Sequence, residues 1–306
     1  GFTFLDPFKT AREYLFLKNK CDILIALTHL GFESDVMLAD SMPAGIDLII
    51  GGHSHTLVRD EQIHNGILIT QAGSKLKFGT LIKLTLGSDG SLKRTAQIID
   101  IKDAKKEDPS VRAIVDKYND NPTLKAVIAT ATDSFSSSEE LGYLMADAQR
   151  DAAGADIALL NPGGVRMDRL PRGPVTVMNV YQLDPFGNEL TLTTLTGKEI
   201  VSLMTASYSI DDNSPLIPSG ITIKVKLGAD GRPADFILTK DDGTPLSMDK
   251  TYTVAMNNYM TSVYKYQHSD PGRSMFMSTA DALMKYLKKQ QNIKSYRGEK
   301  RVEIVK

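Results

Sequence analysis

Three of the five histidines follow two apolar runs of the chain and could bind a metal ion together. His29 comes after the run 21–28, and His53 and His55 follow the run 46–50 across two glycines. In an α/β sheet, ligands bind outside the carboxyl ends of strands, where loops bring side chains together. Imidazole nitrogens suit Zn²⁺, Mn²⁺ and similar divalent ions. We therefore predict a metal site at these histidines, with a purely structural role as the alternative for any single one.

A glycine-rich turn could bind a phosphorylated ligand. The turn Asn161-Pro-Gly-Gly-Val-Arg166 follows a third apolar run. Gly163 and Gly164 allow the backbone to approach a ligand closely, and Asn161 offers both donors and acceptors. Arg166 can form a bidentate pair with phosphate or a contact with ribose. The alternative is an ordinary turn with a surface arginine.

Strands and helices have to position these side chains, and the hydrophobic pattern predicts an α/β fold. The runs 21–28 and 46–50 are nearly continuous, which predicts strands buried on both faces, with a helix at 34–41 between them and another at 6–20 before them. Further strands are expected at 66–70, 80–86, 94–102, 157–160, 189–195, 221–227 and 251–256, and further helices at 139–152 and 280–290. Alternating helices and strands favour a layered α/β architecture.

The length of 306 residues predicts about two domains. The segment 104–121 is highly charged, and its few apolar residues are spaced as one helical stripe. We expect a linker helix there, between a first domain at 1–103 and a second at 122–306.

The composition excludes several partners. The 36 Lys and Arg nearly balance 37 Asp and Glu, so no overall basic field exists to bind a nucleic acid polymer or an anionic membrane. No apolar stretch approaches the roughly 18 to 20 residues that span a bilayer.

The single cysteine, Cys21, excludes an internal disulfide. A signal peptide is expected to be absent or already removed, and the start at Gly1 favours a processed or trimmed product.

Two segments give the chain a family resemblance. Residues 25–31, Ile-Ala-Leu-Thr-His-Leu-Gly, and residues 47–56, Asp-Leu-Ile-Ile-Gly-Gly-His-Ser-His-Thr, resemble the last two metal-ligand motifs of the calcineurin-like metallophosphoesterases of the 5'-nucleotidase family. The second domain resembles that family's C-terminal nucleotide-binding domain. The resemblance implies that 1–103 is the C-terminal half of a metallophosphoesterase sandwich and that 122–306 binds substrate.

The resemblance also implies metal ligands. The family holds two divalent ions, one bound by residues matching His29 and His53 and the other by the residue matching His55. Its bridging Asp and its catalytic His come from other motifs, and no Asp-x-His or Gly-Asn-His occurs in this chain. We therefore expect an incomplete site, with the catalytic residues unassigned and with a second chain as a possible source of the missing ligands.

In the family's substrate domain, an Asn contacts the base and an Arg contacts the phosphate, and these match Asn161 and Arg166. Phe186 and Tyr259 match the two rings that clamp the base, since a base can stack on any aromatic face. Without the resemblance, core packing would be the default for each ring. Segments 133–138 and 260–265 lack an Arg and a Gly-Gly-Asp of the family, which predicts weakened or altered nucleotide recognition.

The activity implied by the resemblance is metal-dependent hydrolysis of a nucleoside monophosphate to nucleoside and phosphate, in a periplasmic or secreted protein. Because metal-ligand motifs are missing, we expect the chain alone to be inactive or weakly active. One alternative is a non-catalytic nucleotide-binding subunit or fragment that needs another chain for its metal site. Another is an unrelated mononuclear metallohydrolase that uses only the three histidines.

Overall fold

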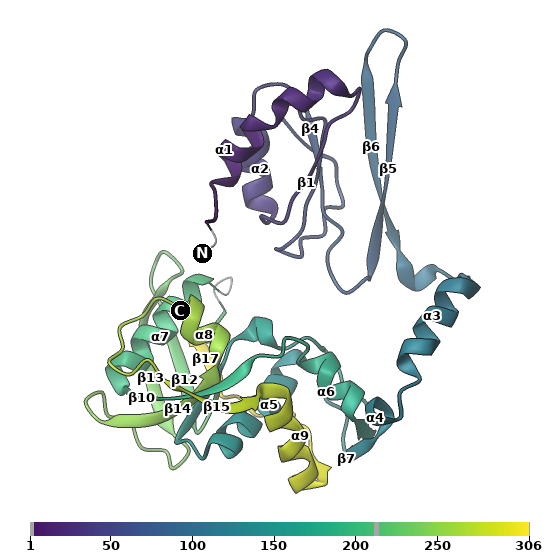
Figure 1. The fold of residues 1–306 in the computed structure, drawn as a ribbon. Helices are drawn as coiled ribbons and strands as arrows, with labels where there is room; N and C mark the ends of the chain where they lie inside the picture. Colours follow the sequence, from purple (N-terminus) through teal and green to yellow (C-terminus); the bar gives the residue numbers. More distant parts are fainter. Residues whose placement is uncertain (1–2, 211–213, 306) are drawn as a thin grey trace. The chain divides into compact units, whose positions relative to one another are not determined.

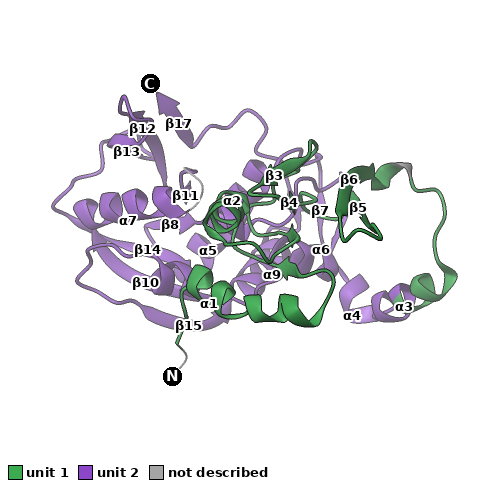
Figure 2. Cartoon of the chain, turned by 90° about the horizontal axis from the view of Figure 1, so that it is seen from above, with its two compact units in different colours: residues 1–114 green, residues 115–306 purple. Residues whose placement is uncertain are grey.

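The structure is a computed structural model that describes residues 3–210 and 214–305, so that Gly1 lies outside the described residues. The chain divides into two compact units, residues 1–114 and 115–306, here called unit 1 and unit 2 (Figure 2). Both combine helices with strands, so the predicted α/β class is confirmed. Among the described helices, none is both long and apolar enough to cross a membrane.

Unit 1 contains a small sheet and a long hairpin (Figure 1). Its helical segments are α1 (Pro7–Glu13), the 3-10 helix η1 (Leu15–Lys20) and α2 (Phe32–Ser41). The sheet has the order β1-β2-β4-β3, formed by β1 (Ile25–Leu27), β2 (Leu48–Ile50), β4 (Ile67–Thr70) and β3 (Gln62–His64). The hairpin consists of β5 (Phe78–Leu86) and β6 (Leu92–Asp100). The first three strands of the sheet order are parallel, and α2 packs on them through Leu38 and Ile49.

The first strand differs from its prediction. β1 covers three residues, and Ile25 and Leu27 are 45% and 82% exposed, so the prediction of a strand buried on both faces is wrong there. The reason is its place at the edge of the sheet, where β2 is its only pairing partner among the described residues. The predicted strand at 46–50 does contain the buried β2. The helix predicted at 6–20 changes to a 3-10 helix after Glu13.

Unit 2 is built on three sheets. The largest has the order β11-β8-β14-β10-β15, formed by β11 (Ile217–Ser219), β8 (Ile157–Leu160), β14 (Thr251–Asn257), β10 (Glu189–Thr196) and β15 (Arg273–Ser278). The other two are β13-β12-β17, formed by Pro233–Lys240, Ile221–Leu227 and Val302–Val305, and β16-β7-β9, formed by Asn292–Ile293, Val127–Ala131 and Gly173–Thr176. Within the largest sheet β8 and β14 are parallel, so their carboxyl ends meet at one edge.

The helices of unit 2 are α4 (Pro122–Lys125), α5 (Ser138–Ala153), α6 (Val177–Leu183), α7 (Gly197–Ile210), α8 (Asn258–Val263) and α9 (Thr279–Gln290). The predicted helix at 139–152 is confirmed as α5, which packs against α9 (Figure 1). Its ends follow from the sequence. The hydroxyl of Ser137 accepts a hydrogen bond from the Glu140 N–H at 3.2 Å, and Gly154, with φ of +60°, ends the helix.

The boundary between the units lies within helix α3 (Pro109–Asn119), inside the segment 104–121 that we predicted as a linker. The apolar stripe of α3 is exposed: Val111 is 56% and Tyr118 is 71% accessible. The exact domain bounds at 103 and 122 stay predictions.

Candidate functional site

The structure brings His29 and His53 together at the edge of the unit 1 sheet. Leu27 of β1 pairs in parallel with Ile50 of β2, so the residues that follow the two strands emerge side by side. The centroids of the two imidazole rings are 5.2 Å apart, with the rings nearly edge to face at 65°. Parallel neighbouring strands therefore account for the meeting of side chains that lie far apart in sequence.

The two glycines before His53 are needed for close packing. A Cβ atom on Gly52 would lie 2.9 Å from Nδ1 of His29, and one on Gly51 would lie 2.2 Å from Oδ2 of Asp35. Both distances are too short for a real side chain. Glycine at these positions therefore lets the loop pass directly beside the histidine ring and over the buried carboxylate.

His55 does not join the pair in a metal-binding group. His53 and His55 have φ values of +79° and +56°, which residues other than glycine seldom adopt. Across residues 3–210 and 214–305, no three side chains of His, Cys, Asp or Glu form a group that could hold a metal ion. The imidazoles of His29 and His53 have the right chemistry for a divalent ion, but two donors are too few for a two-metal centre.

Gln71, which the sequence analysis did not single out, fixes the histidine loop. Its side chain is buried, and its Oε1 accepts hydrogen bonds from the Ser54 hydroxyl at 3.0 Å and from the Thr56 N–H at 2.6 Å. Its Nε2 donates to the carbonyl of Gly52 at 3.0 Å. One buried amide thus binds the backbone on both sides of His53. No local sequence signal marks it, because the partners come from the loop and not from its own strand.

Asp35 lies beneath the same loop and was also missed. Its side chain is fully buried, and neither of its carboxylate oxygens has a hydrogen-bond partner within the described residues. Burial raises the pKa of Asp35 above its ordinary value, and the nearby Thr28 hydroxyl offsets only part of this effect. A buried, poorly compensated carboxylate is costly to the fold.

In unit 2, Asn161 is held at the end of strand β8 by a second amide. Asn161 and Asn257 are 6% and 2% exposed, and Nδ2 of Asn257 donates a hydrogen bond to Oδ1 of Asn161 at 2.9 Å. The two residues meet because β8 and β14 are parallel neighbours. A Cβ on Gly164 would lie 3.2 Å from Oδ1 of Asn161, so the glycine leaves room for this amide. Gly163 lies beside the Nδ2 of the same residue.

Arg166 and Phe186 contact each other at the surface of unit 2. The guanidinium carbon lies 5.3 Å from the ring centroid, a cation–π contact, and Phe186 is 50% exposed. Asp184 anchors the loop before the ring, because its buried carboxylate accepts hydrogen bonds from the Thr279 hydroxyl at 2.5 Å and from the backbone of Phe186. Burial raises the pKa of Asp184. Phe186 is therefore a surface ring on an anchored loop, not a core residue.

Tyr259 is likewise not part of a core. It lies on α8, is 40% exposed, and contacts the edge of Tyr264 with ring centroids 6.0 Å apart. The Glu189 N–H donates to Oδ1 of Asn258 at 3.0 Å, which ties the start of β10, just after Phe186, to the start of α8. The two predicted clamp rings thus belong to segments joined at one end of the sheet. That they face each other across a base stays a prediction.

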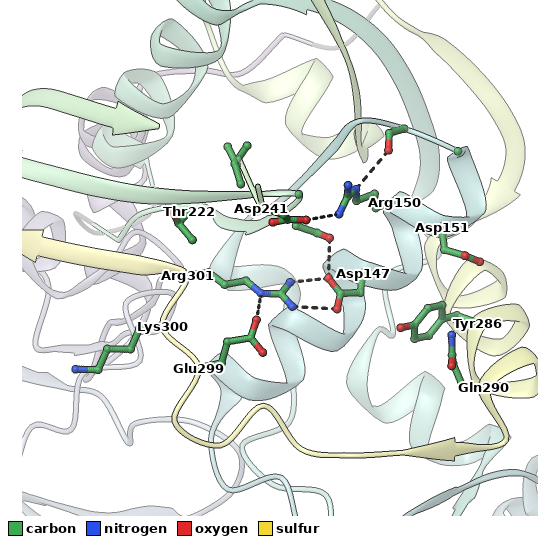
Figure 3. Close-up of a pocket in the computed structure, with 15 residues that line it drawn as sticks. Asp147, Arg150, Asp151, Thr222, Asp241, Tyr286, Gln290, Glu299, Lys300 and Arg301 are labelled. Carbon is green, nitrogen blue, oxygen red and sulfur yellow. Dashed lines mark hydrogen bonds and ion pairs between the residues drawn. The ribbon is translucent and has the colours of Figure 1, made fainter. Parts of the chain in front are cut away.

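A separate polar pocket of about 620 Å³ lies elsewhere in unit 2 (Figure 3). Several of its charged groups pair with one another: Arg301 binds Asp147, and Arg150 binds Asp241 at 3.0 Å. None of the residues predicted for the nucleotide site lines it. These two ion pairs stabilise unit 2 at this pocket.

Known proteins with similar sequences include nucleotide phosphoesterases and 5'-nucleotidases. Residues 122–265 match the family model for the 5'-nucleotidase C-terminal domain. The chain is 29% identical over 287 residues to the Trifunctional nucleotide phosphoesterase protein YfkN of Bacillus subtilis, a match that covers 84% of this chain and 20% of that protein. It is 27% identical over 321 residues to a 5'-nucleotidase of Vibrio cholerae, which covers 85% and 56% respectively. The chain thus spans between a fifth and about half of these relatives.

A solved structure gives the same result. The 5'-nucleotidase precursor from Thermus thermophilus superimposes with a TM-score of 0.82 at 27% identity, over 99% of this chain and 68% of that one. The domain match, the relatives that cover most of this chain and the structural likeness agree. Residues 122–265 form a 5'-nucleotidase C-terminal domain, and over most of its length the chain is similar to proteins of the 5'-nucleotidase family.

Proposed function

We propose that this chain serves the metal-dependent hydrolysis of a nucleoside monophosphate to nucleoside and phosphate. The observation that carries the proposal is the arrangement at one sheet edge of unit 2. There a buried amide pair, Asn161 and Asn257, lies at the ends of two parallel strands, and the neighbouring segments carry the exposed rings of Phe186 and Tyr259. Exposed aromatic rings beside a fixed amide are features that bind a base, not features of a core.

In this proposal each group of unit 2 has one task. Asn161 forms a hydrogen bond with the base, and Phe186 and Tyr259 stack on its two faces. Arg166 is exposed, and its guanidinium can leave the Phe186 ring or remain on it while it binds phosphate. The backbone at Gly163 and Gly164 lets the ligand approach closely.

The metal part of the proposal requires further ligands. His29 and His53 would bind a divalent ion, which would supply electrostatic stabilisation of the phosphoryl group. We propose that a second polypeptide segment or chain supplies the remaining metal ligands, including those that would bind an ion together with His55. The exposed edge of β1, where Leu27 is 82% accessible, supports this idea because uncovered strand edges pair readily.

The main alternative is a nucleotide-binding subunit without catalysis of its own. It is favoured by the lack, within the described residues, of three side chains arranged to hold a metal ion. The same observation disfavours a mononuclear hydrolase built on the three histidines. A periplasmic or secreted location rests on the family resemblance and is part of the proposal.

Calorimetry with adenosine, AMP and methyl phosphate tests the nucleotide site. We expect both adenosine and AMP to bind more tightly than methyl phosphate, and Tyr259→Ala to weaken both by about 1 to 3 kcal/mol through loss of a stacking surface. Tyr181→Ala is the matched control, since Tyr181 is a similarly exposed tyrosine on α6. Equal binding of methyl phosphate and AMP, or no effect of Tyr259→Ala, would exclude the aromatic clamp.

A further inference from the structure

Asn257 links the helix that carries Tyr259 to the amide of Asn161. It ends strand β14 and is the N-cap of α8, where its Oδ1 accepts a hydrogen bond from the Met260 N–H at 2.9 Å. Its Nδ2 donates to Oδ1 of Asn161 at 2.9 Å. Both side chains are more than nine-tenths buried, so water cannot replace either bond.

The chain of donors fixes both amide orientations. A backbone N–H can only donate, so the atom of Asn257 that faces Met260 must be its oxygen. The other end of the Asn257 amide is then its NH₂ group, which can only donate, so the atom of Asn161 that faces it must also be an oxygen. This leaves the NH₂ group of Asn161, which lies beside the glycine-rich turn, as the end of the amide that is free to bind a ligand.

We propose that Asn257 is a positioning residue of the nucleotide site, which commits Asn161 to donate a hydrogen bond to an acceptor atom of the base. The inference rests on the function proposed above. It adds a rule of specificity: the ligand edge that meets Asn161 carries an unprotonated ring nitrogen or a carbonyl oxygen, and not an amino group. It also couples base recognition to the start of α8, and hence to Tyr259.

The variant Asn257→Asp separates the two tasks of Asn257. A carboxylate still accepts from the Met260 N–H, so the cap of α8 is retained, but it cannot donate to Asn161. The Asn161 amide then has to turn so that its NH₂ group meets the carboxylate, which presents its oxygen to the ligand. The ligand-facing group therefore changes from donor to acceptor while the side chain keeps its size.

The experiment uses calorimetry of the full chain with adenosine and with its 1-deaza, 3-deaza and 7-deaza analogues, each of which lacks one ring nitrogen. For the natural sequence we expect one analogue to bind about tenfold more weakly than adenosine, because one hydrogen bond is lost. In Asn257→Asp we expect adenosine to bind about tenfold more weakly and the difference among the analogues to fall below about twofold.

Two further variants serve as a second test and as a control. Asn257→Ser can cap α8 with its hydroxyl but is too short to reach Asn161, so it should lose the same discrimination even if Asn257→Asp does not fold. Asn121→Asp is the matched control, because Asn121 caps α4 through the Thr123 N–H at 2.9 Å, and it should bind all ligands as the natural sequence does.

The outcomes distinguish the inference from the function on which it rests. If the natural sequence binds adenosine but does not discriminate among the analogues, or if both Asn257 variants keep its discrimination, the inference is wrong and the proposed function stands. If the natural sequence binds neither adenosine nor AMP, the proposed function fails and the inference fails with it.

Discussion

The amides of Asn161 and Asn257 are buried in unit 2, and the hydrogen bond between them orients Asn161. In unit 1, by contrast, His29, His53 and His55 are exposed, and the buried Gln71 holds the loop that carries His53 and His55. In unit 2 every hydrogen bond that orients Asn161 comes from within the unit. In unit 1 the loop is fixed, but the described residues contribute only two neighbouring imidazoles. Under the proposed function, the nucleotide site of unit 2 is already formed, whereas the metal site of unit 1 needs additional ligands.

The largest expected effect concerns catalysis. With Mn²⁺ or Zn²⁺ supplied, the isolated chain should hydrolyse AMP more than a thousandfold more slowly than the ~10 per second typical of enzymes, because two imidazoles cannot build a two-metal centre. Release of phosphate measures the rate. The double variant His29→Ala, His53→Ala should lower it little further. Turnover near ten per second would show that unit 1 is complete, and the contrast between the units would disappear.

The next prediction tests how unit 2 keeps its shape. The guanidinium of Arg301 binds both oxygens of Asp147 at 2.5 and 3.0 Å (Figure 3). It also lies 4.8 Å from the ring centroid of Tyr143 and 5.0 Å from that of Tyr296. Arg301→Ala leaves a poorly solvated carboxylate without its cationic partner, so the free energy of unfolding of unit 2 should fall by about 3 to 5 kcal/mol.

Urea unfolding followed by hydrogen exchange in peptides of unit 2 measures this change. The control is Lys198→Ala, since Lys198 pairs with Asp249 in an exposed ion pair at 2.7 Å, and surface pairs contribute about 0 to 1 kcal/mol. Similar losses for the two variants would mean that the buried network does not stabilise unit 2.

The sequence predicted most elements of the fold because their hydrophobic patterns are local. Apolar runs and apolar spacing predicted β2, β8, α5 and α9. The error at β1 has a physical cause: an apolar run does not reveal whether a neighbouring strand covers it, and here Leu27 lies at an uncovered edge.

The candidate site could be predicted only in part. His29 and Asn161 were found because each directly follows a predicted strand, and His53 because it follows one across two glycines. The residues that hold the loops of His53 and Phe186 were missed, since Gln71 and Asp184 act through partners distant in sequence. Asn257 had a usable signal, because an Asn between a strand and a helix is typical of an N-cap.

A smaller effect is expected in unit 1 from Gly51→Ala. The added methyl group would approach Oδ2 of Asp35 to 2.2 Å, and the buried carboxylate has no room to move away. Overpacking of this kind costs about 1 to 3 kcal/mol of stability. Gly79→Ala is the control, because its methyl group would meet Ile101 at an ordinary 3.6 Å. If hydrogen exchange in unit 1 were equally affected by both variants, the loop would not be tightly packed over Asp35.

The last and smallest prediction uses opposite pKa shifts in the two units. Burial raises the pKa of Asp35 in unit 1. For Asp147 in unit 2 burial alone would raise the pKa, but hydrogen bonds from Arg301 and Ser219 outweigh it and lower the pKa. Folded unit 1 therefore takes up a proton more readily than the unfolded chain, while folded unit 2 does so less readily. The two carboxyls should give the units opposite pH dependence.

As the pH falls from neutral toward the ordinary Asp value of about 3.9, protonation of Asp35 should stabilise unit 1. As the pH falls below about 3.9 toward the lower pKa of Asp147, unit 2 should lose the stability that its ionised carboxylate contributes.

The variant Asp35→Asn isolates the effect of Asp35 on unit 1, because it keeps the shape of the side chain and removes its charge. At pH 7 it should stabilise unit 1 by about 1 kcal/mol, the lower end of the cost of an unpaired buried polar group, and the gain should shrink as the pH approaches 4. Urea unfolding of both proteins between pH 4 and 7 measures the difference. A gain from Asp35→Asn that did not change with pH would mean that Asp35 does not titrate in this range, and the proposed contrast in pH dependence would be wrong.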